Sequence, residues 1–102
     1  MESRNYELTN ESIKVLGRKL YRIRCIKDFQ YAKKGDLGGF IENYENLKGD
    51  AWVGDNAKIF GDAKIFGDAE VFGNAWVGDQ ACIFGRARIF DNKVFGFANI
   101  YG

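Results

Sequence analysis

The sequence predicts an all-β protein whose chain winds into a short solenoid. The first observation is a period of six, because an aliphatic residue recurs at every sixth position from residue 41 to residue 89. The second is that an alanine follows most of these aliphatic residues by four positions. Neither an α-helix nor a two-faced strand has this period, whereas stacked repeats do. The aliphatic series is Ile41, Leu47, Val53, Ile59, Ile65, Val71, Val77, Ile83 and Ile89, and the alanines are Ala57, Ala63, Ala69, Ala75, Ala81 and Ala87.

Corner residues provide the third observation. Glycine or aspartate stands two positions after most of the aliphatic residues. These residue types tolerate the left-handed backbone that a sharp corner requires. We therefore expect short strands to alternate with corners, with the aliphatic residue and the alanine of each unit pointing inward. The expected corners are Asp55, Gly61, Gly67, Gly73, Asp79, Gly85, Asp91 and Gly96.

This pattern resembles the hexapeptide-repeat family over about residues 41–102. The resemblance implies a left-handed parallel β-helix in which three hexads make one triangular coil of eighteen residues. The stem then has about three coils and a height of about 16 Å, at about 4.8 Å per coil. At this spacing Asn56, Asn74 and Asn92 fall at one corner, where stacked asparagines hydrogen-bond. Glu70 and Arg88 become neighbours of opposite charge on one face.

One repeat is shorter than the others. The unit Ile89–Lys93 has five residues before Val94, where the others have six. A residue is therefore missing where an alanine is expected, and we expect a local distortion near Asn92 and Lys93. Either the fold tolerates the loss of one residue at this corner, or the loss bends the stem and shapes a binding surface.

Residues 1–40 are expected to form an N-terminal β cap, and residues 41–102 the solenoid. The cap contains a short strand at Tyr6–Leu8 and a hairpin whose arms, Ile13–Val15 and Leu20–Ile26, are joined by Leu16–Gly17. Tyr21, Ile23 and Cys25 alternate with arginines, so we expect them to share one apolar face. The glycine-rich residues 33–39 link this hairpin to the first hexad.

The cap segment carries a second resemblance. Its runs "LYRIRCIKDF", "KKGDLGGFIE" and "GDAWV" are similar to the N-terminal cap of bacterial and prophage hexapeptide-repeat proteins, which are often named transferases from the repeat alone. The resemblance implies a phage or mobile-element setting. Small phage proteins without catalytic residues often bind host proteins, so the implied function is inhibition of a host protein, such as a defence protein.

Charge is divided between the two parts of the chain. Residues 1–40 hold nine Lys/Arg and five Asp/Glu, a net charge of +4, whereas residues 41–102 hold six and nine, a net charge of −3. The basic cap either binds an anionic partner or merely solvates the outer face of a hairpin. Nucleic acid is not an expected partner, because the aromatic residues lie mostly on the acidic stem.

The sequence has no hydrophobic run long enough for a signal peptide or a membrane span. The two cysteines lie in different modules, so a disulfide is not expected and a cytoplasmic location is the simplest prediction.

The chain contains no histidine. The hexapeptide-repeat acyltransferases that it resembles use a histidine as general base, and the carbonic anhydrases of the same fold bind zinc through three histidines. We therefore expect no catalytic residue, no metal and no cofactor. Two alternatives stay open: an acyltransferase-like protein that is degenerate or completed by a partner subunit, and a self-assembling structural module.

Aromatic residues recur directly before or after the inward aliphatic position, and this position is expected to face outward. At eighteen residues per coil, Phe66, Phe84 and Tyr101 form one ladder and Phe72 and Phe90 form a second. On the third face, Phe60 and Phe95 lie beside Gly78. Such ladders either cover themselves or form an interface with a protein partner. The predicted partner-binding residues are Phe66, Phe84, Tyr101, Phe72, Phe90, Trp52 and Trp76.

Self-association is a further expectation. The sequence stops in mid-hexad after Ile100, which leaves the last coil open. A second copy placed tail to tail about a two-fold axis is the expected remedy, with a trimer joined through the phenylalanine ladders as the rival arrangement. The predicted interface residues are Val94, Phe95, Ile100 and Tyr101.

Overall fold

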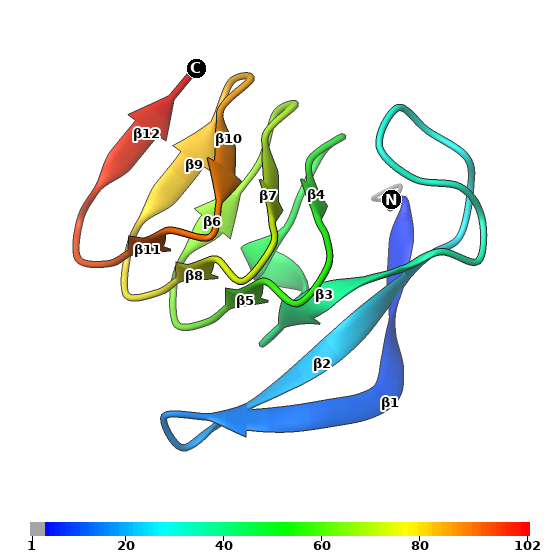
Figure 1. Cartoon of the computed structure of the whole chain (residues 1–102), viewed down its shortest axis with the longest axis horizontal. Helices are drawn as coiled ribbons and strands as arrows, with labels where there is room; N and C mark the ends of the chain where they lie inside the picture. Colours follow the sequence, from blue (N-terminus) through cyan, green and yellow to red (C-terminus); the bar gives the residue numbers. More distant parts are fainter. Residues whose placement is uncertain (1–3) are drawn as a thin grey trace.

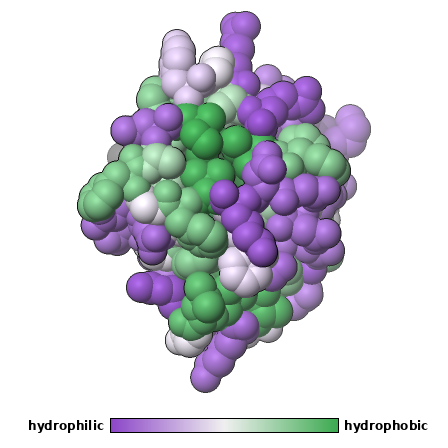
Figure 2. Space-filling view, turned by 60° about the vertical axis from the view of Figure 1, so that its left-hand side comes forward, coloured by the Kyte–Doolittle hydropathy of each residue, from purple (hydrophilic) through white to green (hydrophobic). Residues whose placement is uncertain are grey.

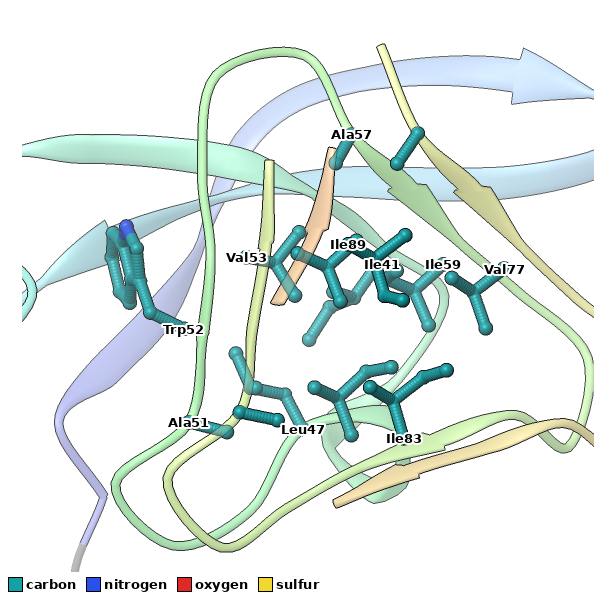
Figure 3. Close-up of a cluster of buried hydrophobic side chains, with 14 of the residues drawn as sticks. Ile41, Leu47, Ala51, Trp52, Val53, Ala57, Ile59, Val77, Ile83 and Ile89 are labelled. Carbon is teal, nitrogen blue, oxygen red and sulfur yellow. The ribbon is translucent and has the colours of Figure 1, made fainter. Parts of the chain in front are cut away.

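The inward positions of the repeat build a β-solenoid of about three turns. The structure, a computed structural model, describes residues 4–102 and is almost entirely β. Figure 3 shows Ile41, Ile59 and Val77 aligned side by side and Leu47 and Ile83 opposite them, all within the coil. The side chains of the aliphatic series are buried, and most of them have no exposed surface. Burial of a continuous apolar stack therefore stabilises a fold whose strands are only two or three residues long.

The coils stack so that each strand pairs in parallel with the strand one turn later (Figure 1). One face has the order β4-β7-β10 and a second has the order β6-β9-β12. The third face has the order β3-β5-β8-β11 and continues into the cap. The strands of the stem are β4 (Trp52–Val53), β5 (Lys58–Ile59), β6 (Lys64–Ile65), β7 (Glu70–Phe72), β8 (Trp76–Val77), β9 (Cys82–Phe84), β10 (Arg88–Phe90), β11 (Lys93–Val94) and β12 (Asn99–Tyr101).

All the expected corners have the left-handed backbone. The glycines have φ between 66° and 73°, and Asp55, Asp79 and Asp91 have φ of 54°, 58° and 60°. The aspartates also have a role that the sequence did not reveal, because their carboxylates accept a hydrogen bond from a backbone N–H of a neighbouring coil. These bonds are Gly73 N to Asp55 Oδ2 at 3.0 Å, Asn74 N to Asp91 Oδ1 at 2.8 Å and Gly96 N to Asp79 Oδ2 at 3.0 Å.

The eighteen-residue spacing predicted a Glu70–Arg88 pair and an asparagine ladder, and only the first of these forms. Glu70 and Arg88 are register partners, and the Arg88 Nη2 lies 3.1 Å from the Glu70 Oε1, so this prediction is confirmed. The asparagine ladder is wrong: in the described chain no hydrogen bond joins the side chains of Asn56, Asn74 and Asn92, which are exposed. The corner aspartates carry the contacts between coils instead.

The short repeat is absorbed within one corner. Trp76 N donates to Asn92 O, as Lys58 N donates to Ala75 O one coil earlier, so Asn92 takes the backbone place of an alanine. Register resumes at once, because Lys93 pairs with Trp76. The expected distortion is therefore confined to the turn at Asp91 and does not bend the stem.

The cap is an antiparallel extension of one solenoid face. β1 (Tyr6–Val15) pairs with β2 (Arg18–Cys25), and β2 pairs with β3 (Leu37–Ile41). The two short segments expected within residues 6–15 form one strand with a register shift between Leu8 and Ser12. β3 also pairs in parallel with β5, so one sheet runs across the expected boundary at residue 40.

The hairpin has two buried faces rather than one. Ile23 and Cys25 join the main core as expected, but Tyr21 is only half-buried and Leu20 is fully buried instead. A register shift between Arg22 and Arg24 exchanges the faces along β2. Leu20 packs with Val15, Phe40 and Phe60 in a second, smaller cluster. The hairpin therefore covers part of the third solenoid face.

The first corner of the first coil, between β3 and β4, contains a single 3₁₀ turn, η1 (Tyr44–Asn46). Asn43 caps it, because its side chain accepts a hydrogen bond from Glu45 N at 2.8 Å. The side chain of Asn46 is buried beneath this turn. Among residues 4–102 the structure contains no helix with the length and apolarity needed to cross a bilayer.

Candidate protein-binding surface

Three aromatic rings form a ladder on the face β6-β9-β12. Each follows an inward isoleucine, and parallel pairing brings this position into register from coil to coil. Phe66 and Phe84 are stacked, with ring centroids 5.2 Å apart and ring planes 3° apart. The Tyr101 ring follows 5.1 Å beyond Phe84. Phe66 is 37% exposed and Tyr101 is 74% exposed, so the ladder reaches solvent as the repeat predicted.

The stacking restricts what this ladder is able to bind. Phe84 has a ring on each side, so its faces are covered and its edge is turned outward. A nucleobase stacks on an open ring face, and the middle of the ladder does not offer one. Ring edges instead suit aliphatic side chains and edge-to-face aromatic contacts of a protein partner. The outward neighbours on these strands are Lys64, Cys82 and Asn99, of which only the lysine carries a charge.

A second ladder lies on the face β4-β7-β10. The centroids of Phe72 and Phe90 are 5.0 Å apart, and the guanidinium of Arg88 lies 5.6 Å from the centre of the Phe72 ring. Arg88 also pairs with Glu70, so charged groups lie directly beside these rings. This ladder is therefore more polar in its surroundings than the ladder on β6-β9-β12.

Two aromatic residues that were expected to be exposed are buried. Trp52 points away from the coil interior in Figure 3, but the cap covers it, and its ring lies 5.6 Å from that of Phe29 in an edge-to-face contact. Phe60 is buried against the hairpin cluster. Both do point outward from their own coil, and only the position of the cap hides them. Trp52 is thus not accessible to a partner in this structure.

The third face keeps one half-buried aromatic residue. Trp76 meets Phe60 edge to face, and the amino groups of Lys93 and Lys58 lie 5.5 and 6.0 Å from its ring centre. Phe95 lies 6.0 Å from Phe60, and the two flank Gly78 as expected, because any Cβ at Gly78 would overlap the Phe60 ring.

The residues predicted to form an oligomer interface lie on the last coil. Val94 is nearly buried and Ile100 partly buried, whereas Phe95 and Tyr101 are exposed. Figure 2 brings this end of the stem forward and shows hydrophobic surface gathered there. The interface itself stays a prediction.

Phe97 and Leu16 are the most exposed of the apolar side chains whose exposure the sequence did not predict. Phe97 is 80% exposed and stands directly after the corner residue, where the other units have polar residues. The replacement of a polar residue by phenylalanine at this position can be seen in the sequence of the repeat, and it is the signal that could have identified Phe97. Leu16 is 73% exposed at the tip of the β1–β2 hairpin, where its φ is 53°. No apolar period pointed to it, because it lies in a turn.

Hollows lie between the cap and the stem in two regions. One has a volume of about 460 Å³ and lies between the hairpin and the solenoid, with Arg18, Glu42, Asp62, Asp79 and Phe97 on its walls. The other region contains adjoining hollows of about 280 and 530 Å³ that share Tyr31 and Glu70.

Tyr31 and Cys25 have perturbed ionisation. Burial raises the pKa of Tyr31, and the nearby carboxylates of Glu70 and Asp68 raise it further. Its hydroxyl donates to the backbone oxygen of Asp68. Burial likewise raises the pKa of the Cys25 thiol. Both groups therefore stay protonated and neutral near pH 7, which does not suit a nucleophile or a base.

Metal ligands do not cluster in the part of the chain that the structure describes: no group of three or more His, Cys, Asp or Glu side chains is placed to hold an ion.

No protein-family model matches the chain, and no curated protein matches it.

Proposed function

We propose that this protein is a non-catalytic binding module that captures a protein partner through the ladder Phe66–Phe84–Tyr101. The observation that carries the proposal is an exposed row of ring edges on a solenoid face with one charged outward neighbour. Aromatic residues dominate interface hot spots, and a rigid stack loses little conformational entropy when it binds. The resemblance of the cap to prophage proteins suggests a host protein as the partner, with inhibition as the outcome, and the cytoplasm of the host as the place of action.

The test replaces Phe66 and Phe84 together by serine. The double variant is expected to lose the partner that the unchanged protein captures from host extract, because the apolar edges of the ladder are removed. Leu37→Ser is the matched control, since Leu37 is 56% exposed but lies on β3, away from this face. Capture is followed by quantitative mass spectrometry, and folding by thermal denaturation.

Two results would contradict this proposal. One is equal capture by the ladder variant and the unchanged protein. The other is a loss of about 2 kcal/mol or more of unfolding free energy with no selective loss of any partner, which would show that the rings stabilise the stem by covering one another.

A second expectation separates the binding module from an acyltransferase. With acetyl-CoA and a panel of sugar and amine acceptors, thiol release is expected to stay at the level of the protein-free control, because the chain has no histidine to act as general base. Turnover that rises in proportion to protein concentration would overturn the non-catalytic assignment and favour the transferase alternative.

A further inference from the structure

The tip of the β1–β2 hairpin contains a residue that the fold itself does not explain. Leu16 and Gly17 form a two-residue loop with φ of 53° and 78°, the combination of a type I′ turn. Asparagine, aspartate or glycine is favoured at the first position, and a leucine with positive φ is strained. This leucine is also exposed, so no burial in the described chain offsets the strain. A strained apolar side chain that nothing else in the fold requires motivates a functional role for the tip, here a contact with another molecule.

The surroundings of Leu16 indicate the charge of that other molecule. Lys14 and Lys19 stand on either side of the loop, and neither makes an ion pair with another residue of the described chain. Figure 2 shows hydrophobic surface between polar groups at the lower end of the molecule, the height at which the hairpin tip lies in Figure 1. The tip, called the knob below, is thus the apolar side chain of Leu16 flanked by the positive charges of Lys14 and Lys19. A surface complementary to this knob is a hollow with negative charges and an apolar wall.

The chain itself carries such a hollow. The 460 Å³ corner hollow has the carboxylates of Asp62 and Asp79 and the exposed ring of Phe97 on its walls. Glu42 in the same hollow is already paired with Arg18 at 3.1 Å, and the carboxylate of Asp79 accepts a backbone N–H. Asp62 forms no ion pair within residues 4–102, so its charge is available to a second molecule.

Knob and hollow adjoin each other on one side of the molecule. Arg18 is two residues from Leu16 and lines the hollow. A knob and a complementary hollow on neighbouring patches form a self-complementary surface, which closes about a two-fold axis when each copy inserts its knob into the hollow of the other. Leu16 is not among the residues that line the hollow of its own copy.

We propose that the protein forms a symmetric dimer in which the hairpin tip of each copy, with Leu16 at its centre, occupies the corner hollow of the other. Leu16 contacts the ring of Phe97, and Lys14 and Lys19 face Asp62. This interface is separate from the ladder of the proposed function and from the last-coil residues Val94 and Ile100. It leaves the ladder open to a partner in both copies.

The decisive variant is Leu16→Asn. Asn-Gly is the favoured sequence of a type I′ turn, so this change relieves the strain and removes only the apolar contact. The variant is expected to melt at the same or a higher temperature at low protein concentration, yet to dimerise at least about 10-fold more weakly. Leu37→Asn is the matched control and is expected to leave dimerisation unchanged. Sedimentation equilibrium between about 5 and 500 µM measures both, a range that covers the dissociation constants of weak to moderate dimers.

Charge exchange tests the orientation of the two copies. Asp62→Lys is expected to weaken the dimer, and Lys14→Glu with Lys19→Glu is expected to do the same. Combining all three changes is expected to restore it, because the opposite charges face each other again. A protein that stays monomeric over the whole concentration range overturns the proposal. So does a dimer that Leu16→Asn leaves intact, or a triple variant that dimerises no more strongly than Asp62→Lys or the double lysine variant.

Discussion

Gly38→Ala is expected to lower the free energy of unfolding by about 3 kcal/mol, the upper part of the range for overpacking a core. A Cβ at residue 38 would lie 2.5 Å from the backbone oxygen of Val53, 2.7 Å from Ile23 and 2.8 Å from the Trp52 ring. The backbone oxygen belongs to the first coil and cannot move without separating β3 from the stem. Urea denaturation followed by circular dichroism measures the loss.

Gly54→Ala is the matched control for this experiment. Both changes remove a glycine, so both reduce the entropy of the unfolded chain equally. A Cβ at residue 54 meets its nearest neighbours at 3.4–3.6 Å, which is ordinary contact, and its φ is not in the left-handed region. Its cost is expected to stay below about 1 kcal/mol. Equal losses from the two variants would show that β3 does not lie against the first coil as described.

Asn46→Ala is expected to cost about 3 kcal/mol or more, because it removes four hydrogen bonds and leaves Asn43 N, Gly61 O and Ala63 O without the partner that the structure gives them. The Asn46 side chain accepts from Glu42 N and Asn43 N, both at 3.0 Å, and donates to Gly61 O at 3.2 Å and Ala63 O at 2.8 Å. It thereby ties η1 to the second coil, and only an amide offers both the acceptor and the two donors.

The readout for Asn46→Ala is local as well as global. Hydrogen exchange at the amide of Asn43 is expected to accelerate, because its acceptor is removed, alongside the loss measured by denaturation, whereas the Glu42 amide keeps Ile59 O as an acceptor. Asn74→Ala is the control, since Asn74 is exposed at a corner and its side chain is not part of this network. Unchanged protection at the Asn43 amide in the Asn46 variant would contradict the role assigned to this side chain.

The ladder on β6-β9-β12 could be predicted because it follows from the period alone. Once a turn of the solenoid takes eighteen residues, Phe66 and Phe84 must fall one above the other, and parallel pairing sets their spacing. The same spacing of eighteen residues correctly predicted that Glu70 lies beside Arg88. It failed for Asn92, because a corner one residue shorter moves this asparagine into the backbone place of an alanine.

The exposure of a ring could not be predicted in the same way. Trp52 and Phe60 occupy outward positions of the repeat, as Phe66 does, yet both are buried. What covers them is the cap, through Phe29 over Trp52 and the hairpin over Phe60. The cap has no repeat, so its position depends on the register shift within β2 and on the close approach at Gly38.

The sequence by itself determined the solenoid, its inward series, its corners and the alignment of rings along one face. These are local properties that repeat, and a periodic pattern fixes them because each coil contacts only its neighbours. Only the tertiary structure decided which outward faces stay open, and that the tip of the hairpin adjoins the corner hollow. Both depend on contacts between residues far apart in the chain, such as Arg18 with Glu42 and Leu20 with Phe60, for which no period exists.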